Sequence, residues 1–224
     1  MNYIILFTEM IFVFVIMYFL YKYAKKDGLY LGISIFAVIL CLIQFRMIDI
    51  FLFSVSMGIP LVIGILALNN IIIHRYGIDE VKRIILTFTI SYTIIGFVIM
   101  FSTAIMGSQY NLVSNNDFDM LFGYSLYNIR YFIGGFIATS VMLLLDSNIY
   151  YSIRKSKNNL LLDNLGAIFI VLFVESLIYV LLSSVGVFNF VRLFGMMVIR
   201  YLTEAVLGLI GIIPIWILVK MKDK

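Results

Sequence analysis

Glu175 is the residue of this chain best placed to do chemistry, because it stands in the middle of a long apolar run. Its neighbours Phe173, Val174 and Leu177 are typical of a membrane-spanning segment. A carboxylate there costs roughly 2.5–3.5 kcal/mol on insertion scales unless it meets a cation, a polar ligand or a proton. We therefore predict that Glu175 binds a polar solute or carries a proton. The alternative is a structural ion pair with an Arg of a neighbouring helix.

Two further pairs of charged residues lie in apolar runs. Arg200 and Glu204 are four residues apart, so a helix places them on one face, one turn apart. This spacing predicts an ion pair that is either self-contained or opens to hold a polar solute. Arg130 and Asp146 are separated by about 24 Å along a helix and cannot contact each other. Arg130 is expected at the solute or the outer interface, and Asp146 near the inner end as a proton carrier or a cap.

Other polar residues stand near the ends of the apolar runs. Asn69 and Asn70 offer amide donors and acceptors to a planar solute, and His74 is either a proton carrier or an interface residue. Gln44 is predicted to form part of a solute site or gate, or a polar hinge. The predicted solute-binding set is Glu175, Asn69, Asn70, Gln44, Glu204 and Arg130, and the predicted proton carriers are Asp146, Glu175 and His74.

Membrane-spanning helices must position these residues, because 63% of the 224 residues are hydrophobic and only 12% are charged. The mean hydropathy of +1.10 is too high for a soluble globule of this length. At about 20 residues per crossing, the apolar runs predict seven helices: residues 4–21, 29–45, 52–73, 84–106, 128–150, 162–183 and 194–219. We therefore predict an all-α polytopic membrane protein with one transmembrane domain, residues 1–224. Gly58 and Pro60 interrupt the third run and allow an unwound or re-entrant stretch there.

The basic residues predict how the chain is oriented. Twelve of the 16 Lys and Arg residues fall in four short stretches between the apolar runs, at residues 22–26, 75–83, 154–157 and 220–224. Positive charge marks cytoplasmic loops, so we predict an outside N-terminus and a cytoplasmic C-terminus in the cell membrane. This placement explains the net charge of +4 better than nucleic-acid binding does. We therefore expect no nucleic-acid partner.

Several kinds of catalytic and metal site are missing from the sequence. It contains no phosphate-binding loop of the form GxxxxGK[ST], no HExxH motif and no Gly-x-Ser-x-Gly motif. Cys41 is the single cysteine and lies in an apolar run, so it offers no disulfide framework and no thiolate metal cluster. We therefore predict that the protein is not an enzyme and uses no metal or cofactor. Its expected partners are a small-molecule substrate and the lipid bilayer, and a homodimer is left open.

A resemblance to a known family spans the whole chain. The segments that carry it are Asp27-Gly28-Leu29-Tyr30, Ile43-Gln44, Gly58, the run from Arg75 to Arg83, Arg130, Asp146, Glu175 to Tyr179, and Tyr201 to Pro214. In order and spacing they resemble the queuosine precursor transporter family, also called the vitamin uptake transporters. The resemblance implies a six-helix core preceded by an N-terminal helix. It also implies import of deazaguanine bases that are used to modify transfer RNA.

The chain departs from the family pattern at several polar positions. Asn70 and His74 stand where the family usually has an acidic pair, and Glu204 stands where it has Lys. These changes favour a changed solute. We therefore predict a secondary transporter for a queuosine precursor or a similar nucleobase-like solute, whose amidine-like edge Glu175 binds. The alternatives are a vitamin-binding subunit of an ATPase-driven uptake system and a non-transporting membrane protein derived from the family.

Overall fold

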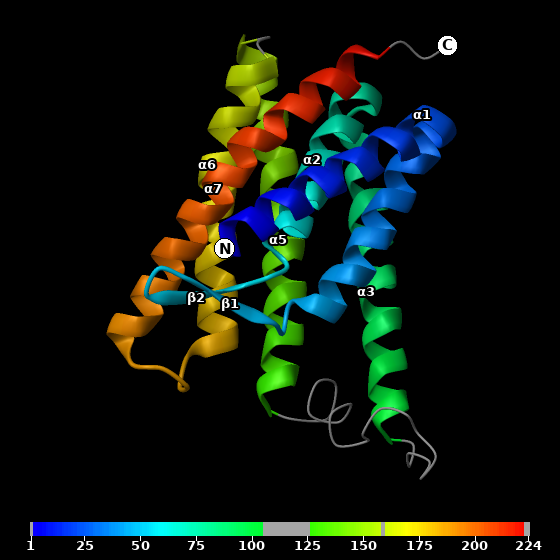
Figure 1. Cartoon of the computed structure of the whole chain (residues 1–224). Coiled ribbons are helices and arrows are strands. Elements are labelled where there is room, and N and C mark those ends of the chain that lie inside the picture. The colour runs from blue at the N-terminus through cyan, green and yellow to red at the C-terminus, as the bar shows by residue number, and fades with distance from the viewer. Residues whose placement is uncertain (1, 105–125, 158–159, 222–224) are drawn as a thin grey trace.

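The computed structural model describes residues 2–104, 126–157 and 160–221, and almost all of them are helical (Figure 1). The elements are α1 (Asn2–Ile43), β1 (Met47–Ile50), β2 (Phe53–Ser56), α2 (Ile59–Tyr76), the 3-10 helix η1 (Ile78–Glu80), α3 (Val81–Ala104), α5 (Leu126–Lys157), α6 (Leu160–Ser184) and α7 (Phe190–Lys220). Six helices of the described part are long and apolar enough to cross a membrane. This confirms the predicted all-α polytopic fold.

The first two predicted helices, 4–21 and 29–45, are the two arms of α1. The chain bends back at Lys25, whose φ of 49° and ψ of −125° are not helical (Figure 1). A Cβ on Gly28 would stand 2.1 Å from the carbonyl oxygen of Leu20. Only glycine fits there, because a side chain would collide with the backbone of the other arm. One helix with a sharp bend therefore holds two of the seven predicted segments.

The predicted third helix, 52–73, is wrong at its beginning. An antiparallel hairpin of β1 and β2 occupies residues 47–56 and pairs Ile50 with Phe53, and α2 begins only at Ile59. Pro60 stands in the first turn of α2. Backbone N–H groups in the first turn have no acceptor within the helix, so proline, which has no N–H, is tolerated there. The Phe53 ring packs on α7 so closely that a Cβ on Gly195 would stand 1.9 Å from it. The hairpin is thus seated against the bundle.

The remaining predicted segments coincide with helices of the structure, and where both ends are described they differ by at most seven residues, at the end of α5 (Leu126–Lys157). The predictions 84–106, 128–150, 162–183 and 194–219 correspond to α3, α5, α6 and α7. Residues 105 and 106 lie outside the described part of the chain.

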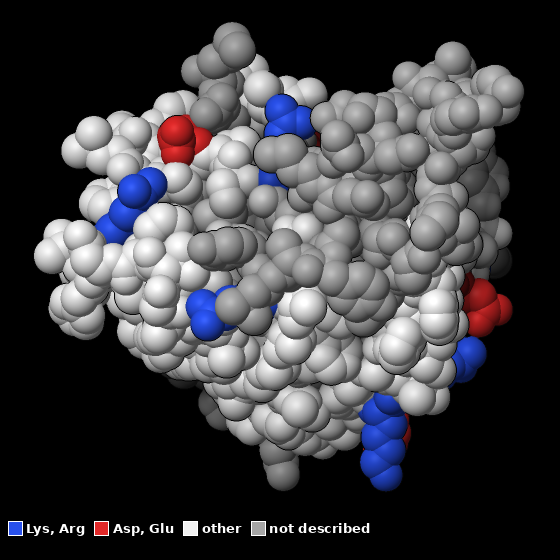
Figure 2. All heavy atoms as spheres, turned by 90° about the horizontal axis from the view of Figure 1, so that it is seen from below, with Lys and Arg blue, Asp and Glu red and all other residues white. Residues whose placement is uncertain are grey.

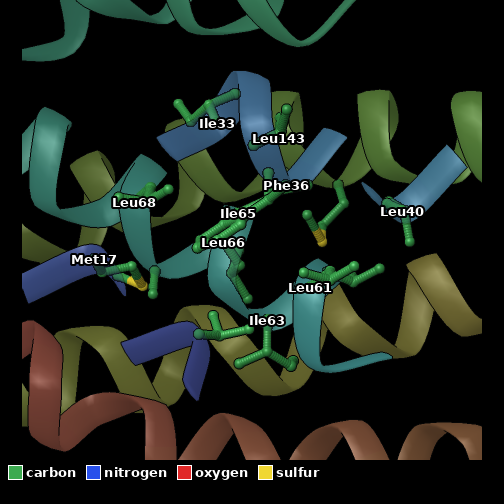
Figure 3. Close-up of a cluster of buried hydrophobic side chains, with 14 of the residues drawn as sticks. Met17, Ile33, Phe36, Leu40, Leu61, Ile63, Ile65, Leu66, Leu68 and Leu143 are labelled. Carbon is green, nitrogen blue, oxygen red and sulfur yellow. The ribbon is translucent and has the colours of Figure 1, made fainter. Parts of the chain in front are cut away.

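The α2 helix forms the centre of the bundle. Every residue from Ile59 to Ile73 is buried, so α2 is enclosed by protein on all sides. In Figure 3 its side chains Ile63, Ile65, Leu66 and Leu68 lie among Met17, Ile33 and Phe36 of α1 and Leu143 of α5. The outer helices instead expose large apolar side chains, as lipid-facing surfaces require. Polar residues on α2 therefore face protein and not lipid.

The basic stretches meet at one end of the bundle, at the top of Figure 1. There Arg75, at the end of α2, donates to the carbonyl oxygens of Leu218 at 2.7 Å and Val219 at 3.0 Å, in the last turn of α7. Lys26 forms an ion pair with Glu80 at 2.6 Å. Figure 2 shows the opposite face, where the charged side chains of the described residues are few and scattered. The structure thus gathers the described basic loops on one side, as the charge pattern requires.

Candidate functional site

A buried ion-pair cluster lies between α6 and α7. Arg200 donates from Nη2 to Oε1 of Glu175 at 2.8 Å and from Nε to Oε2 of the same carboxylate at 3.2 Å. Its Nε also lies 2.8 Å from Oε1 of Glu204, one turn along α7. These side chains are at most 3% exposed. The expected pair of Arg200 with Glu204 is therefore present, and so is an ion pair between Glu175 and an Arg of the neighbouring helix.

The cluster contains one cation and two carboxyl groups. Ser176 donates to Oε2 of Glu204 at 2.7 Å, and the Arg200 guanidinium lies 3.8 Å from the centre of the Tyr179 ring. Arg200 is the cation paired with both carboxyl groups in the described residues. Taking charges out of water is costly unless each is compensated. A solute that donates hydrogen bonds, or a proton, would supply the missing compensation.

A small gap adjoins this cluster. Its volume is about 190 Å³, and no part of it is wide enough to hold a water molecule. It is lined by Leu40, Gln44, Ser56, Gly58, Val62, Gly135, Thr139, Glu175, Tyr179 and Arg200, from six elements and the segments between them. Three buried polar atoms on its wall have no hydrogen-bond partner: Gln44 Oε1, Thr139 Oγ1 and Arg200 Nη1. Because buried polar atoms are normally paired, this cluster of unpaired atoms suits a polar ligand.

Gln44 is held in this wall from several directions. Its Nε2 donates to the Tyr92 hydroxyl group, which in turn donates to the Phe132 carbonyl oxygen at 3.0 Å. The carbonyl oxygen of Gln44 accepts from the Ser56 hydroxyl at 3.0 Å and from the Tyr179 hydroxyl at 3.3 Å. These contacts join the end of α1 to the hairpin, α3 and α6. They also fix the side chain so that its amide oxygen remains the unpaired atom.

Two adjacent glycines of α5 provide a test of the Gln44 position. A Cβ at Gly135 would stand 1.9 Å from Gln44 Oε1 and 3.0 Å from the Tyr92 hydroxyl, whereas a Cβ at Gly134 would meet nothing closer than 3.4 Å. We expect the added methyl group of Gly135→Ala to displace the Gln44 side chain. The loss of one hydrogen bond between Gln44 and the solute, worth ~1.5 kcal/mol, should then lower solute uptake about tenfold or more. Gly134→Ala should behave like the wild type. Equal uptake by both variants, at equal membrane abundance, would show that the position of Gln44 is unimportant.

A second polar cluster lies deeper in the bundle, between α2 and α5. Asn69 Nδ2 donates to Asp146 Oδ2 at 2.6 Å, and the Ser147 hydroxyl lies 3.3 Å from both polar atoms of the Asn69 amide. Asn70 lies against Asp146, but neither polar atom of its side chain has a hydrogen bond of good geometry. Thr139 and Asp146 are seven residues apart on α5, about 10 Å along the helix. The deeper cluster is therefore separate from the gap.

The structure brings together only part of the predicted solute-binding set. Glu175 and Gln44 line the gap, and Glu204 lies behind Arg200. Asn69 and Asn70 belong instead to the deeper cluster, because they follow Val62 on α2 by seven and eight residues, which is about two helical turns towards the basic end.

Two other predicted residues lie away from the gap. Arg130 is near the start of α5, at the end of the bundle away from the basic loops, where its Nη1 donates to the Val185 carbonyl oxygen at 2.7 Å. Arg130 therefore satisfies a backbone carbonyl group at the end of α6, and it is not among the residues that line the gap. His74 lies at the basic end of α2, and its Nδ1 is 2.9 Å from the Tyr150 hydroxyl of α5. These positions place Arg130 and His74 on opposite sides of the buried clusters.

Tyr179 and Thr139 were not among the predicted site residues. Tyr179 follows Glu175 by four residues, so the helical period already placed both on one face of α6. Thr139 likewise follows Gly135 by four residues on α5. An apolar run contains many aromatic and Thr residues, however, and spacing alone does not tell a gap-facing residue from one that faces the core.

The match to a known family covers most of this architecture. Residues 56–219 match the family described as "Putative vitamin uptake transporter". No curated protein and no solved structure matches the chain. The matched region runs from the end of the hairpin to the end of α7 and contains Glu175, Arg200, Glu204 and Asp146. Because this region is well over half of the chain, the protein belongs to the vitamin uptake transporter family and is a multi-pass membrane protein of a transporter family.

Proposed function

We propose that this protein is a secondary transporter that imports a queuosine precursor, a deazaguanine base, or a similar nucleobase-like solute. The observation that best supports this proposal is the gap beside Glu175, with unpaired polar atoms from the turn after α1 and from α5 and α7 on its wall. A deazaguanine base is flat and neutral, and one of its edges presents two adjacent N–H donors. A carboxylate binds such an edge through two parallel hydrogen bonds.

Arg200 occupies the position that such an edge would take. Its Nε and Nη2 contact the two oxygens of Glu175, which is the two-point pattern expected of the solute. When the solute takes over these contacts, Arg200 still has Glu204, whose Oε1 lies 2.8 Å from Nε. In the exchange Arg200 therefore keeps Glu204 as its ion-pair partner, and the two N–H groups of the solute replace Arg200 as the hydrogen-bond donors to Glu175. In this mechanism Arg200 holds the site closed until the solute displaces it.

The other walls of the gap suit the rest of such a solute. The Tyr179 ring, now covered by the Arg200 guanidinium at 3.8 Å, offers an aromatic face to a planar base. Gln44 Oε1 and Thr139 Oγ1 are available to polar atoms on its rim. The gap is too narrow for water, so a solute can enter only after the surrounding side chains or helices move. In the proposed alternating-access cycle, this narrow gap corresponds to a closed conformation.

The proposed function is tested by rescue of queuosine in transfer RNA. The host lacks both precursor synthesis and its own transporter, and it receives a low external concentration of the precursor. We expect the wild-type chain to restore queuosine. Stable expression without rescue would show that the solute is a different one. Rescue that required an ATPase, with the ATPase co-purifying, would show instead that the chain is the solute-binding subunit of an ATPase-driven system.

We also propose that the protein lies in the cell membrane with its N-terminus outside and its basic end in the cytoplasm. A Cys41→Ala background, which removes the buried single cysteine, allows this to be tested. Cysteine at Val185, which is exposed near the outer end of α6, should react with a membrane-impermeant maleimide in intact cells. Cysteine at the exposed Lys82 should react only after permeabilisation. The reverse labelling pattern would invert the proposed orientation.

A further inference from the structure

Asp146 is a buried carboxyl group for which no cation is available in the described part of the structure. Its side chain is fully buried, and none of the ion pairs of the described residues includes it. Its hydrogen-bond partner is the neutral amide of Asn69, and its Oδ1 atom has no partner. An ionised carboxyl group in this position is unfavourable by several kcal/mol, whereas a protonated one is tolerated. This sets Asp146 apart from Glu175 and Glu204, which share Arg200.

Among the side chains that the structure describes, the elements packed against α5 bring no neutralising charge to Asp146. From α2 it meets Asn69 and Asn70, and on its own helix it is followed by Ser147. The titratable groups one turn towards the basic end are His74 of α2 and Tyr150 of α5, which contact each other.

The other two neighbouring helices keep their titratable groups elsewhere. Among the α6 side chains that the structure describes, Glu175 is the charged one, and it is paired with Arg200. In α3 the Tyr92 hydroxyl is engaged by Gln44 and the Phe132 carbonyl oxygen, and Arg83 lies over the Tyr30 ring. Lys82 of α3 is exposed. Asp146 therefore depends on a mobile positive charge for compensation.

We propose that Asp146 binds one proton in the transport cycle, at a site about 10 Å inward of the solute gap, and that this proton drives solute accumulation. The inference rests on the proposed import function. Protonation turns Asp146 Oδ1 into a hydrogen-bond donor, and the adjacent Asn70 amide contains an acceptor oxygen without a partner. A proton on Oδ1 would therefore remove the uncompensated charge of Asp146 and supply a hydrogen-bond donor next to the Asn70 amide. When the inner side opens, the proton leaves towards His74 and Tyr150 at the basic end.

A proton suits this cluster better than a metal ion does. Hard metal ions need several oxygen ligands, preferably including more than one carboxylate. The described residues contain no group of three or more His, Cys, Asp and Glu side chains that would hold one. Asn69 also turns its amide nitrogen, and not its oxygen, towards Asp146. A proton needs only the one free carboxyl oxygen.

Infrared difference spectroscopy tests the proton site without any solute. Purified protein in liposomes is compared at acidic and alkaline pH, and the wild type should show the carbonyl stretch of a buried carboxylic acid that disappears at alkaline pH. Asp146→Asn should lose this band, whereas Asp79→Asn, a change at an exposed acidic residue, should keep it. Bands that are unchanged in Asp146→Asn would overturn the proposal. Because no solute is present, this outcome is independent of whether deazaguanines are imported.

Reconstituted uptake tests the coupling role. An inward proton gradient should drive the wild type to accumulate the deazaguanine above its external concentration. Asp146→Asn, which has the shape of protonated Asp, should still exchange labelled for unlabelled solute but should accumulate none. If that variant does not reach the membrane, Asp146→Glu should change the pH at which the infrared band disappears. Accumulation driven by a sodium gradient at equal pH, or wild-type accumulation by Asp146→Asn, would overturn the proposal. Absence of any wild-type exchange would instead refute the proposed solute.

Discussion

Glu175→Gln is expected to abolish rescue of queuosine at low external precursor. The amide keeps the size of the carboxylate but offers one acceptor oxygen, and it presents an N–H group to the donor edge of the solute. Two charge-assisted hydrogen bonds of about 1.5–3 kcal/mol each are lost or weakened, so apparent affinity should fall about 100-fold or more. The measurement is the queuosine content of transfer RNA over a series of precursor concentrations, at equal abundance in the membrane.

The matched control is Glu80→Gln at the basic end. Glu80 pairs with Lys26 where both side chains are partly exposed, and such pairs contribute only about 0–1 kcal/mol. This variant should therefore rescue nearly as well as the wild type. Partial recovery of Glu175→Gln at high precursor would identify the defect as one of binding. Full rescue by Glu175→Gln at low precursor would place the solute site elsewhere.

Arg200→Met is expected to produce the largest loss of stability of any single change considered. It leaves the carboxyl groups of Glu175 and Glu204 buried without their shared cation, and breaking such a pair costs about 3–5 kcal/mol. Thermal unfolding of the purified protein in detergent measures this effect. Arg192→Met is the control, because Arg192 is exposed near the start of α7 and lies over the Phe188 ring at 4.7 Å. That change should be close to neutral.

A triple variant separates the contribution of the cluster to stability from its contribution to transport. Combining Glu175→Gln, Arg200→Met and Glu204→Gln removes all the charges together, and neutral replacements of buried charge clusters are often tolerated. We expect the triple variant to recover most of the stability lost in Arg200→Met but to show no uptake. Uptake by the triple variant would mean that the charges are dispensable for transport. Failure to recover stability would mean that packing and not charge made Arg200 important.

The apolar runs predicted most of the helices because the length of a membrane crossing and its hydrophobicity are local properties. The segments at α3, α5, α6 and α7 agree with the structure for this reason. The stretch at 52–58 was different, since a short apolar run is equally compatible with strand and helix. Its Phe53 side chain packs against Gly195, far away in the sequence, and tertiary contacts of this kind distinguish the hairpin from a longer α2.

The candidate site divides in the same way. The sequence by itself determined that Glu175 is a costly membrane-depth carboxylate and that Arg200 and Glu204 share a face, because burial depth and helical period follow from the chain alone. Only the tertiary structure decided that Arg200 reaches across to Glu175, that Gln44 meets them at the gap, and that Asn69 and Asp146 form a separate layer. These contacts join helices whose relative rotation and depth depend on side-chain packing between them, which no local pattern encodes.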